Sequence, residues 1–303
     1  MTQGYGAQMQ LSPRYGNAPP FLIENPVGDP LALMVQQRAR LAGLLATFDD
    51  AAWSSPSRCA GWTVQDVVTH LVTTNRFWTA SIAAGLAGKP TTVLATFDPV
   101  ASPAAIVAGL GQRGTSYTLE AFTKSTVELE AAALAVGDRV WTTLAECPAG
   151  HVAIGFVAMH ALWDAVIHER DIMAPLGLSP TENDAELVAC ITYAVAFNLA
   201  LLANSGSTRH AAIRLRGTNP SADAIVELGA SVLVRPNGNA EVKADKSDMA
   251  DKAGEADVVV LQGPTVALLE ALSCRAPMAD FVGDDDRWLF EGIGIVFDQP
   301  SRP

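Results

Sequence analysis

The chain has 303 residues, of which 49% are hydrophobic and 17% are charged, and its formal net charge is −12. This length allows one large domain or two ordinary ones, and we expect two. The negative charge argues against nucleic acid or an anionic membrane surface as a partner.

Residues 1–25 are predicted to form a flexible N-terminal arm. The first twenty are rich in Gly, Gln, Pro and Tyr, and they carry neither the basic start nor the apolar core of a secretory signal. The four cysteines of the chain lie far apart, without the spacing of a zinc or redox motif. A cytoplasmic protein in a reducing setting is therefore expected.

Residues 26–183 are predicted to form four long helices joined by loops. The first helix is expected from Pro30 to Phe48, where apolar residues recur at helical spacing. A loop over residues 53–62 follows, and its Trp side chains indicate that it packs against the protein. Ser102-Pro103 favours the start of the third helix, and residues 120–135 are helix-prone after an interruption by glycines.

The second helix is predicted to begin at an N-cap, Thr63, with Asp66 as its capping-box partner. His70 lies on the flank of the apolar stripe of this helix. There it either faces a cavity between helices or is a half-exposed surface residue.

The fourth helix, expected from about His151 to Met173, concentrates the ionisable side chains. His160, Asp164 and His168 stand at i, i+4 and i+8, which places them along one side. His160 and His168 are about 12 Å apart along the axis and cannot share one ion. A metal would therefore take Asp164 with either His168 or His160, and a third ligand from another element.

His70 on the second helix can complete a site with Asp164 and His168, because bundles build metal sites from facing helices. One coordination position would then stay open for water or substrate. The alternative is a buried polar core in which the carboxylate is only a hydrogen-bond partner of the histidines.

Residues 184–303 are predicted to form a smaller α+β domain. An apolar run, Leu187 to Ala203, approaches the length of a membrane span, but its polar residues and acidic upstream flank indicate a buried helix. Strand-like runs follow at residues 211–216, 230–234 and 256–261, and a further helix is expected after Gly263-Pro264.

Two separated motifs carry a family resemblance. One is Trp53-x-x-Pro-Ser-x-Cys-x-Gly-Trp-Thr-Val-x-Asp-Val-Val-x-His-Leu, and the other is His168-Glu-Arg-Asp-Ile-x-x-Pro-Leu-Gly. Together they resemble the actinobacterial mycothiol-dependent maleylpyruvate isomerase superfamily. The resemblance implies a DinB-like four-helix bundle followed by a sterol-carrier-like α+β domain.

The same resemblance implies a divalent metal, with zinc as the first choice, held by His70, Asp164 and His168. The characterised isomerase has Glu where this chain has Asp164. The shorter carboxylate can still be a ligand if the backbones approach more closely or a water intervenes. His160 then either supports a metal ligand from behind or faces the substrate as a catalytic residue, whereas for Asp171 we favour a local structural role over orienting His168.

Residues 257–284 resemble the C-terminal domain of the superfamily, in which an Arg helps to bind the anionic substrate. Arg275 is the nearest match, and the alternative is an Arg at a helix end that pairs with the acidic cluster at 284–286.

The resulting hypothesis is an enzyme that uses a metal and the small thiol mycothiol to attack a small electrophilic, anionic substrate. It would be an isomerase if the adduct collapses back and a thiol transferase if it does not. A non-catalytic binding or regulatory protein with a vestigial metal site remains the alternative, because fold does not determine function.

Overall fold

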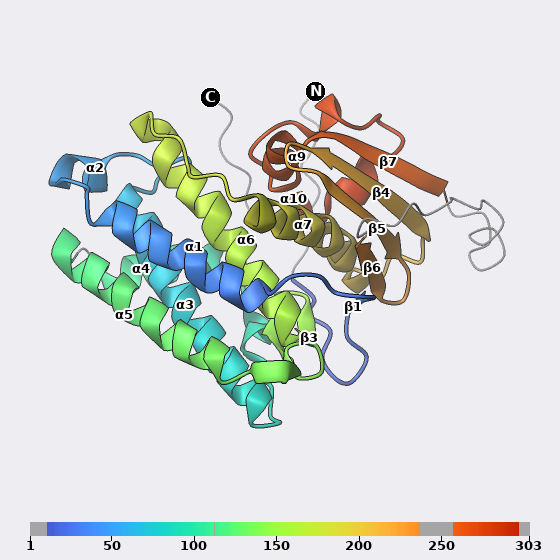
Figure 1. Cartoon of the computed structure of the whole chain (residues 1–303), viewed down its shortest axis with the longest axis horizontal. Helices are drawn as coiled ribbons and strands as arrows, with labels where there is room; N and C mark the ends of the chain where they lie inside the picture. The colour runs from blue at the N-terminus through green and yellow to red at the C-terminus, as the bar shows by residue number, and fades with distance from the viewer. Residues whose placement is uncertain (1–10, 112, 237–256, 297–303) are drawn as a thin grey trace.

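The structure is a computed structural model that describes residues 11–111, 113–236 and 257–296. Four helices form a bundle on one side of the molecule (Figure 1): α1 (Pro30–Leu45), α3 (Val64–Leu86), α5 (Thr115–Leu134) and α6 (Ile154–Met173). The predicted DinB-like bundle and smaller α+β part are thus both present.

Local sequence signals explain where the bundle helices begin. The predicted capping box of α3 is confirmed: the Thr63 side chain accepts from the Asp66 backbone N–H, and the Asp66 carboxylate accepts from the Thr63 backbone N–H. Helix α1 begins with Pro30 after Asp29, whose side chain accepts from two backbone N–H groups of the first turn.

Short elements differ from the sequence-based expectation. The expected loop at 53–62 begins inside a short helix, α2 (Asp50–Ser54). The third predicted helix divides into α4 (Ala101–Leu110) and α5, because Gly111 adopts a φ of 66° and ends α4. A hairpin of β2 (Leu144–Cys147) and β3 (Gly150–Ala153) precedes α6, which therefore begins at Ile154 and not at His151.

The α+β part is a five-stranded sheet in the order β1-β6-β5-β4-β7, with pairs β1·β6 and β4·β7 parallel and the rest antiparallel. The strands are β1 (Phe21–Ile23), β4 (Ala211–Thr218), β5 (Ala222–Leu228), β6 (Val232–Pro236) and β7 (Asp257–Pro264). Strands β1 and β5 were not expected from the sequence. The further helices are α7 (Asp184–Asn204), α9 (Thr265–Leu272) and α10 (Gly292–Val296), with 3-10 turns η1 (Val93–Thr96), η2 (Gly137–Arg139), η3 (Ala174–Leu176), η4 (Met278–Asp280) and η5 (Arg287–Phe290).

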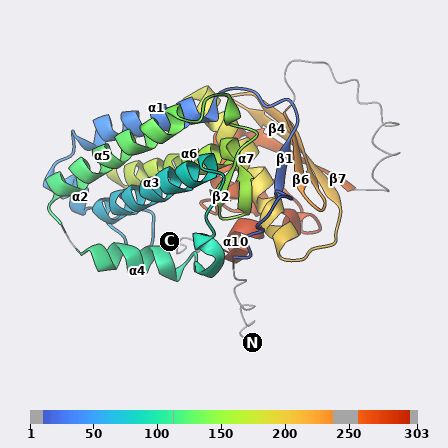
Figure 2. The ribbon, with the colours of Figure 1, turned by 90° about the horizontal axis from the view of Figure 1, so that it is seen from below.

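Helix α7 lies between α6 and the sheet, and both helices are almost wholly buried (Figure 2). By length and composition alone, α7 could cross a membrane, but 83% of its most apolar window is buried inside the protein. The predicted buried helix at 187–203 is thus the central helix of the core.

The predicted flexible arm is ordered from residue 11 onward, which corrects that expectation; residues 1–10 lie outside the described part. Arg14 forms an isolated β-bridge with Gly150 of β3, and β1 pairs with β6 of the sheet. Phe21 is fully buried and stacks on Phe156 of α6. The arm is held because its apolar side chains fill the gap between bundle and sheet.

Candidate metal centre and binding pocket

Three of the predicted site residues converge from two helices. His70 projects from α3, whereas Asp164 and His168 project from α6. Asp164 Oδ1 lies 3.8 Å from His70 Nε2 and 3.6 Å from His168 Nε2, and the three candidate ligand atoms all lie within 4.8 Å of one another. The structure brings these residues together in the pairing of Asp164 with His168, not with His160.

The donor set fits a divalent metal. Ligand atoms about 2 Å from a tetrahedral ion stand about 3.3 Å apart, close to the spacings observed here. These spacings are long for hydrogen bonds. Asp164 Oδ2 is buried and finds no hydrogen-bond partner among the described residues, which leaves an acceptor free to bind an ion. Burial opposes ionisation, but His70 and His168 hold the pKa of the Asp164 carboxyl below its usual value.

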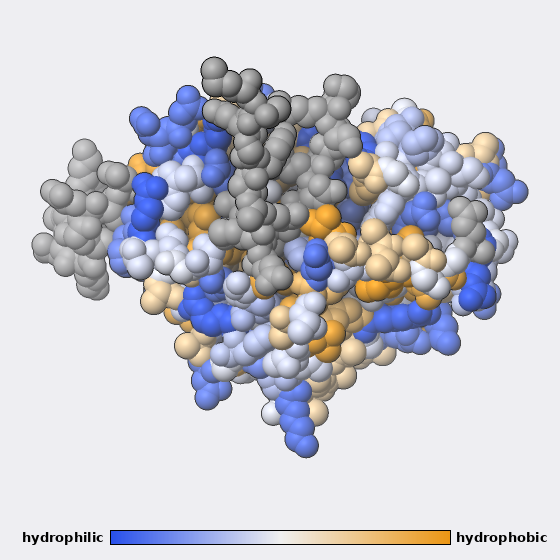
Figure 3. Space-filling view, turned by 180° about the vertical axis from the view of Figure 1, so that it is seen from behind, coloured by the Kyte–Doolittle hydropathy of each residue, from blue (hydrophilic) through white to orange (hydrophobic). Residues whose placement is uncertain are grey.

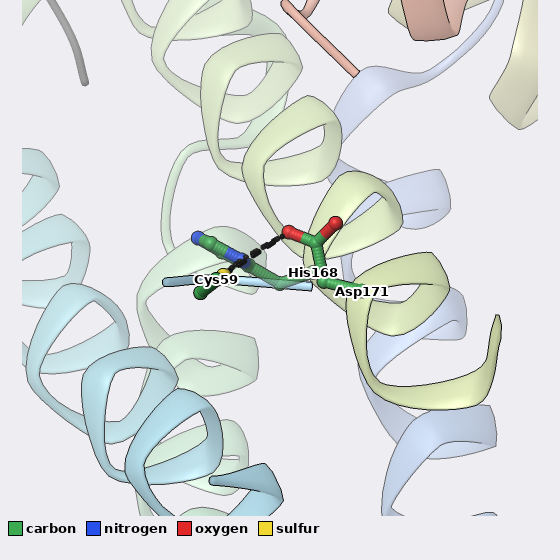
Figure 4. A group of neighbouring side chains, drawn as sticks. All are labelled: Cys59, His168 and Asp171. Atoms are coloured by element: carbon green, nitrogen blue, oxygen red, sulfur yellow. Dashed lines mark hydrogen bonds and ion pairs between the residues drawn. The ribbon is translucent and has the colours of Figure 1, made fainter. Parts of the chain in front are cut away.

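His168 is held in place through its other ring nitrogen (Figure 4). Its Nδ1 lies 3.1 Å from Asp171 Oδ2, one turn further along α6, and 3.6 Å from Cys59 Sγ. A carboxylate only accepts hydrogen bonds, so Asp171 keeps the proton on Nδ1 and leaves the Nε2 lone pair for a metal. The contact with His168, which we had ranked below a local structural role for Asp171, is therefore present in the structure.

Cys59 is a neighbour of the site that the sequence analysis did not assign. Its thiol donates to Asp171 Oδ2 at 3.3 Å, and with His168 and Asp171 it forms a second group that could hold an ion. The only sequence signal was its position in the first family motif, because the cysteine spacing resembles no metal motif.

Asp171 is fully buried and is held by two arginines. Arg275 donates from Nε and Nη2 to its two oxygens at 2.9 and 2.8 Å, and Arg58 donates from Nε at 2.9 Å. Burial raises the pKa of the Asp171 carboxyl, but His168 and Arg275 outweigh this and hold it far below its usual value. Arg275 thus pairs with Asp171 and not with the acidic cluster at 284–286.

His160 stands apart from the three candidate ligands. It is 4% exposed, and its Nδ1 lies 2.6 Å from the Tyr193 hydroxyl. Trp78, Trp163 and Phe197 surround the ring at centroid distances of 5.0 to 5.4 Å. Burial lowers the pKa of His160 to about 4, so the imidazole is neutral at pH 7.

The candidate ligands open into a pocket of about 510 Å³ between α3, α6, the η1–α4 segment and the α+β part. His70, His160, Asp164, His168 and Arg275 all line it, so the pocket contains the three predicted metal ligands and the two predicted catalytic residues. Its volume is in the range of small-molecule sites.

Glu146 holds the η1 segment of the pocket wall in place through hydrogen bonds. The buried carboxylate accepts from the Tyr15 hydroxyl at 2.7 Å and the Thr91 hydroxyl at 2.6 Å. It also accepts from the backbone N–H groups of Val93 and Leu94 at 2.9 and 2.8 Å. Because both of those residues line the pocket, the arm and the hairpin help to shape it.

Residues 34–173 match the family described as mycothiol maleylpyruvate isomerase N-terminal domain. The crystal structure of a histidine-to-alanine mutant of the mycothiol-dependent maleylpyruvate isomerase is similar with a TM-score of 0.55 and 14% identity, over 85% of this chain and 92% of that chain. The unsubstituted isomerase gives 0.54 and 14%, over 84% and 91%. No curated protein matched the chain.

Proposed function

Since the chain belongs to the mycothiol-dependent maleylpyruvate isomerase superfamily, we propose that it is a metal-dependent enzyme that joins mycothiol to a small electrophilic compound. The observation that supports this most directly is the convergence of His70, Asp164 and His168 at the wall of the pocket. Two imidazoles and a carboxylate are the three-ligand set of many catalytic zinc sites, in which a fourth position stays open.

Each residue of the proposed site has a separate role. His70, Asp164 and His168 would hold a divalent ion, with zinc as the first choice. Such an ion supplies a positive charge that binds a thiol sulfur and lowers its pKa toward neutrality. Asp171 keeps His168 in the tautomer that can bind, and Arg275 and Arg58 keep Asp171 ionised and oriented.

His160 is the residue that we propose to face the substrate. It lines the pocket one turn before Asp164, and its neutral ring can accept or donate a proton where a charged ring could not accept one. Isomerisation and transfer differ in whether the new carbon–sulfur bond breaks again. The pocket geometry is compatible with both outcomes.

Metal content tests this proposal. We expect about one divalent ion per chain, by elemental analysis, in protein purified without a histidine tag. His70→Ala and His168→Ala should each abolish tight metal binding, because each removes one of three ligands. His160→Ala should keep the metal but lose turnover. Thermal melts of the three variants control for unfolding.

Two results would count against the proposal. Protein that stays folded and takes up neither zinc nor nickel would favour the non-catalytic binding protein. Equal, slight effects of all three substitutions would leave the histidines and Asp164 as a polar core.

We also propose that the enzyme works in the cytoplasm. Its four cysteines are free thiols, which fits a reducing compartment. Cell fractionation should recover it there, and recovery from culture medium would contradict the assignment.

A further inference from the structure

The walls of the pocket are mainly apolar. Five aromatic side chains contribute to them, namely Trp62, Phe77, Trp78, Phe97 and Trp163. The η1–α4 wall adds Val93 and Ile106, which are 62% and 43% exposed and so carry an apolar surface outward from the pocket. Figure 3 shows apolar residues gathered near the middle of one face of the molecule. An apolar lining of this kind favours an apolar ligand.

The arginines of the pocket are already paired. Among the described residues, Arg58 and Arg275 are the permanently charged cations that line it. Arg275 holds both oxygens of Asp171, and Arg58 donates to Asp171 and, at 2.7 and 3.2 Å, to both oxygens of Glu270. Two guanidinium groups therefore face two carboxylates at this wall. Arg170, outside the lining, also donates to Glu270, at 2.6 Å.

An anionic substrate would have to displace one of these pairs. Releasing Arg275 would leave the fully buried Asp171 with fewer partners, and Asp171 also orients His168. An uncompensated buried carboxylate is strongly unfavourable. Any further positive charge would be that of a metal ion at the proposed centre, where Asp164 and a bound thiolate would together offset the two charges of a divalent ion.

We propose that the second substrate is an uncharged, apolar electrophile of aromatic character, a proposal that rests on the function proposed above. The anionic substrate that the sequence resemblance implied, with Arg275 as its partner, is replaced by a neutral one. Arg275 is then a positioning residue that acts through Asp171. The aromatic side chains provide faces on which a ring can stack.

Two fluorescent probes that share one scaffold test the charge preference directly. N-Phenyl-1-naphthylamine is neutral, and 8-anilino-1-naphthalenesulfonate adds a single negative charge. We expect the neutral probe to bind the full-length protein at least tenfold more tightly. Loss of binding in Trp163→Ala would locate the probe in the pocket. Equal or tighter binding of the sulfonate would overturn the proposal.

A gain of anion binding provides the second test. Glu270→Gln removes the carboxylate that neutralises Arg58, so we expect the sulfonate to bind several-fold more tightly while the neutral probe is unchanged. Glu130→Gln is the matched control: it changes the net charge equally, but Glu130 is an exposed residue of α5 and does not line the pocket. If both variants, or neither, strengthen sulfonate binding, the arginines are not held neutral in the way proposed.

These measurements need neither metal nor turnover, so the two proposals fail separately. If the protein prefers the neutral probe but binds no metal, the proposal of a metal-dependent enzyme is wrong and the proposal of a neutral ligand stands. If it binds metal fully but prefers the sulfonate, the proposal of a neutral ligand is wrong and the proposal of a metal-dependent enzyme stands.

Discussion

Asp171 connects the candidate metal centre to the rest of the protein. It accepts from His168, from Arg58 in the loop before α3, and from Arg275 after α9. One buried carboxylate thus ties the bundle to the α+β part within hydrogen-bonding distance of a candidate ligand. Side chains that orient metal-bound histidines commonly affect affinity nearly as much as some ligands do.

Replacing Asp171 with Asn should weaken metal binding while keeping the ligands themselves. The amide keeps the shape but loses the charge that fixes the His168 tautomer, so we expect a loss of about 10–100-fold in metal affinity. Competition with a chromophoric chelator measures this. Glu182→Gln, which removes a half-exposed carboxylate, should leave the affinity unchanged. Wild-type affinity in folded Asp171→Asn would show that the His168 contact is incidental.

The sequence places the candidate ligands more readily than their surroundings. Asp164 and His168 share one helix, so their spacing allowed this pair beside the alternative of His160 with Asp164, and His70 followed from its position on the facing helix and from the family motif. The orienting role of Asp171 was considered but ranked second, because its partners Arg58 and Arg275 lie more than 100 residues away in sequence on either side. Contacts of that kind depend on packing that no local pattern encodes.

At the scale of elements, α3 and the β2–β3 hairpin approach each other closely. A Cβ added at Gly85, in the last turn of α3, would lie 2.4 Å from the Leu144 backbone oxygen of β2. Ser81 of the same helix exchanges hydrogen bonds at 2.8 Å with the backbone of Glu146. The helix and hairpin therefore fit together backbone to backbone.

Gly85→Ala should destabilise the protein by about 1–3 kcal/mol, because the methyl group has no room without a shift of β2. The control is Gly43→Ala in the last turn of α1, where an added Cβ meets nothing within 4 Å. That change should stabilise the helix by up to about 1 kcal/mol. Urea unfolding of both variants measures the difference. Equal effects would mean that β2 yields freely to α3.

The long helices were predictable because their apolar periodicity and caps are local signals. The β2–β3 hairpin was missed because its strands have only four residues each and carry no alternating pattern. The division between α4 and α5 was foreseen only as an interruption. Short elements depend on their partners, and here the partner of β3 includes Arg14 of the arm.

At the scale of the whole molecule, the N-terminal arm joins the two parts. Strand β1 aligns Phe21 with Val232 of β6, over 200 residues away in sequence. Phe21 stacks on Phe156 of α6 at a centroid distance of 4.9 Å and lies 6.0 Å from the ring of Tyr193 on α7. A three-residue strand beside a polar segment gives no sequence signal of such a role, and for this reason a flexible arm was predicted.

The arm should therefore contribute to global stability through one side chain. Phe21→Ala should lower the free energy of unfolding by about 3–5 kcal/mol, the cost of a large cavity in a core. Leu22→Ala, on the same strand but with a side chain that is 48% exposed, should change it by less than about 0.5 kcal/mol. Because Phe21 touches α6 and α7 at once, Trp fluorescence and far-UV circular dichroism should report the same shifted midpoint. If Phe21→Ala separated the two signals into distinct transitions, the bundle and the sheet would be independent folding units joined by the arm alone.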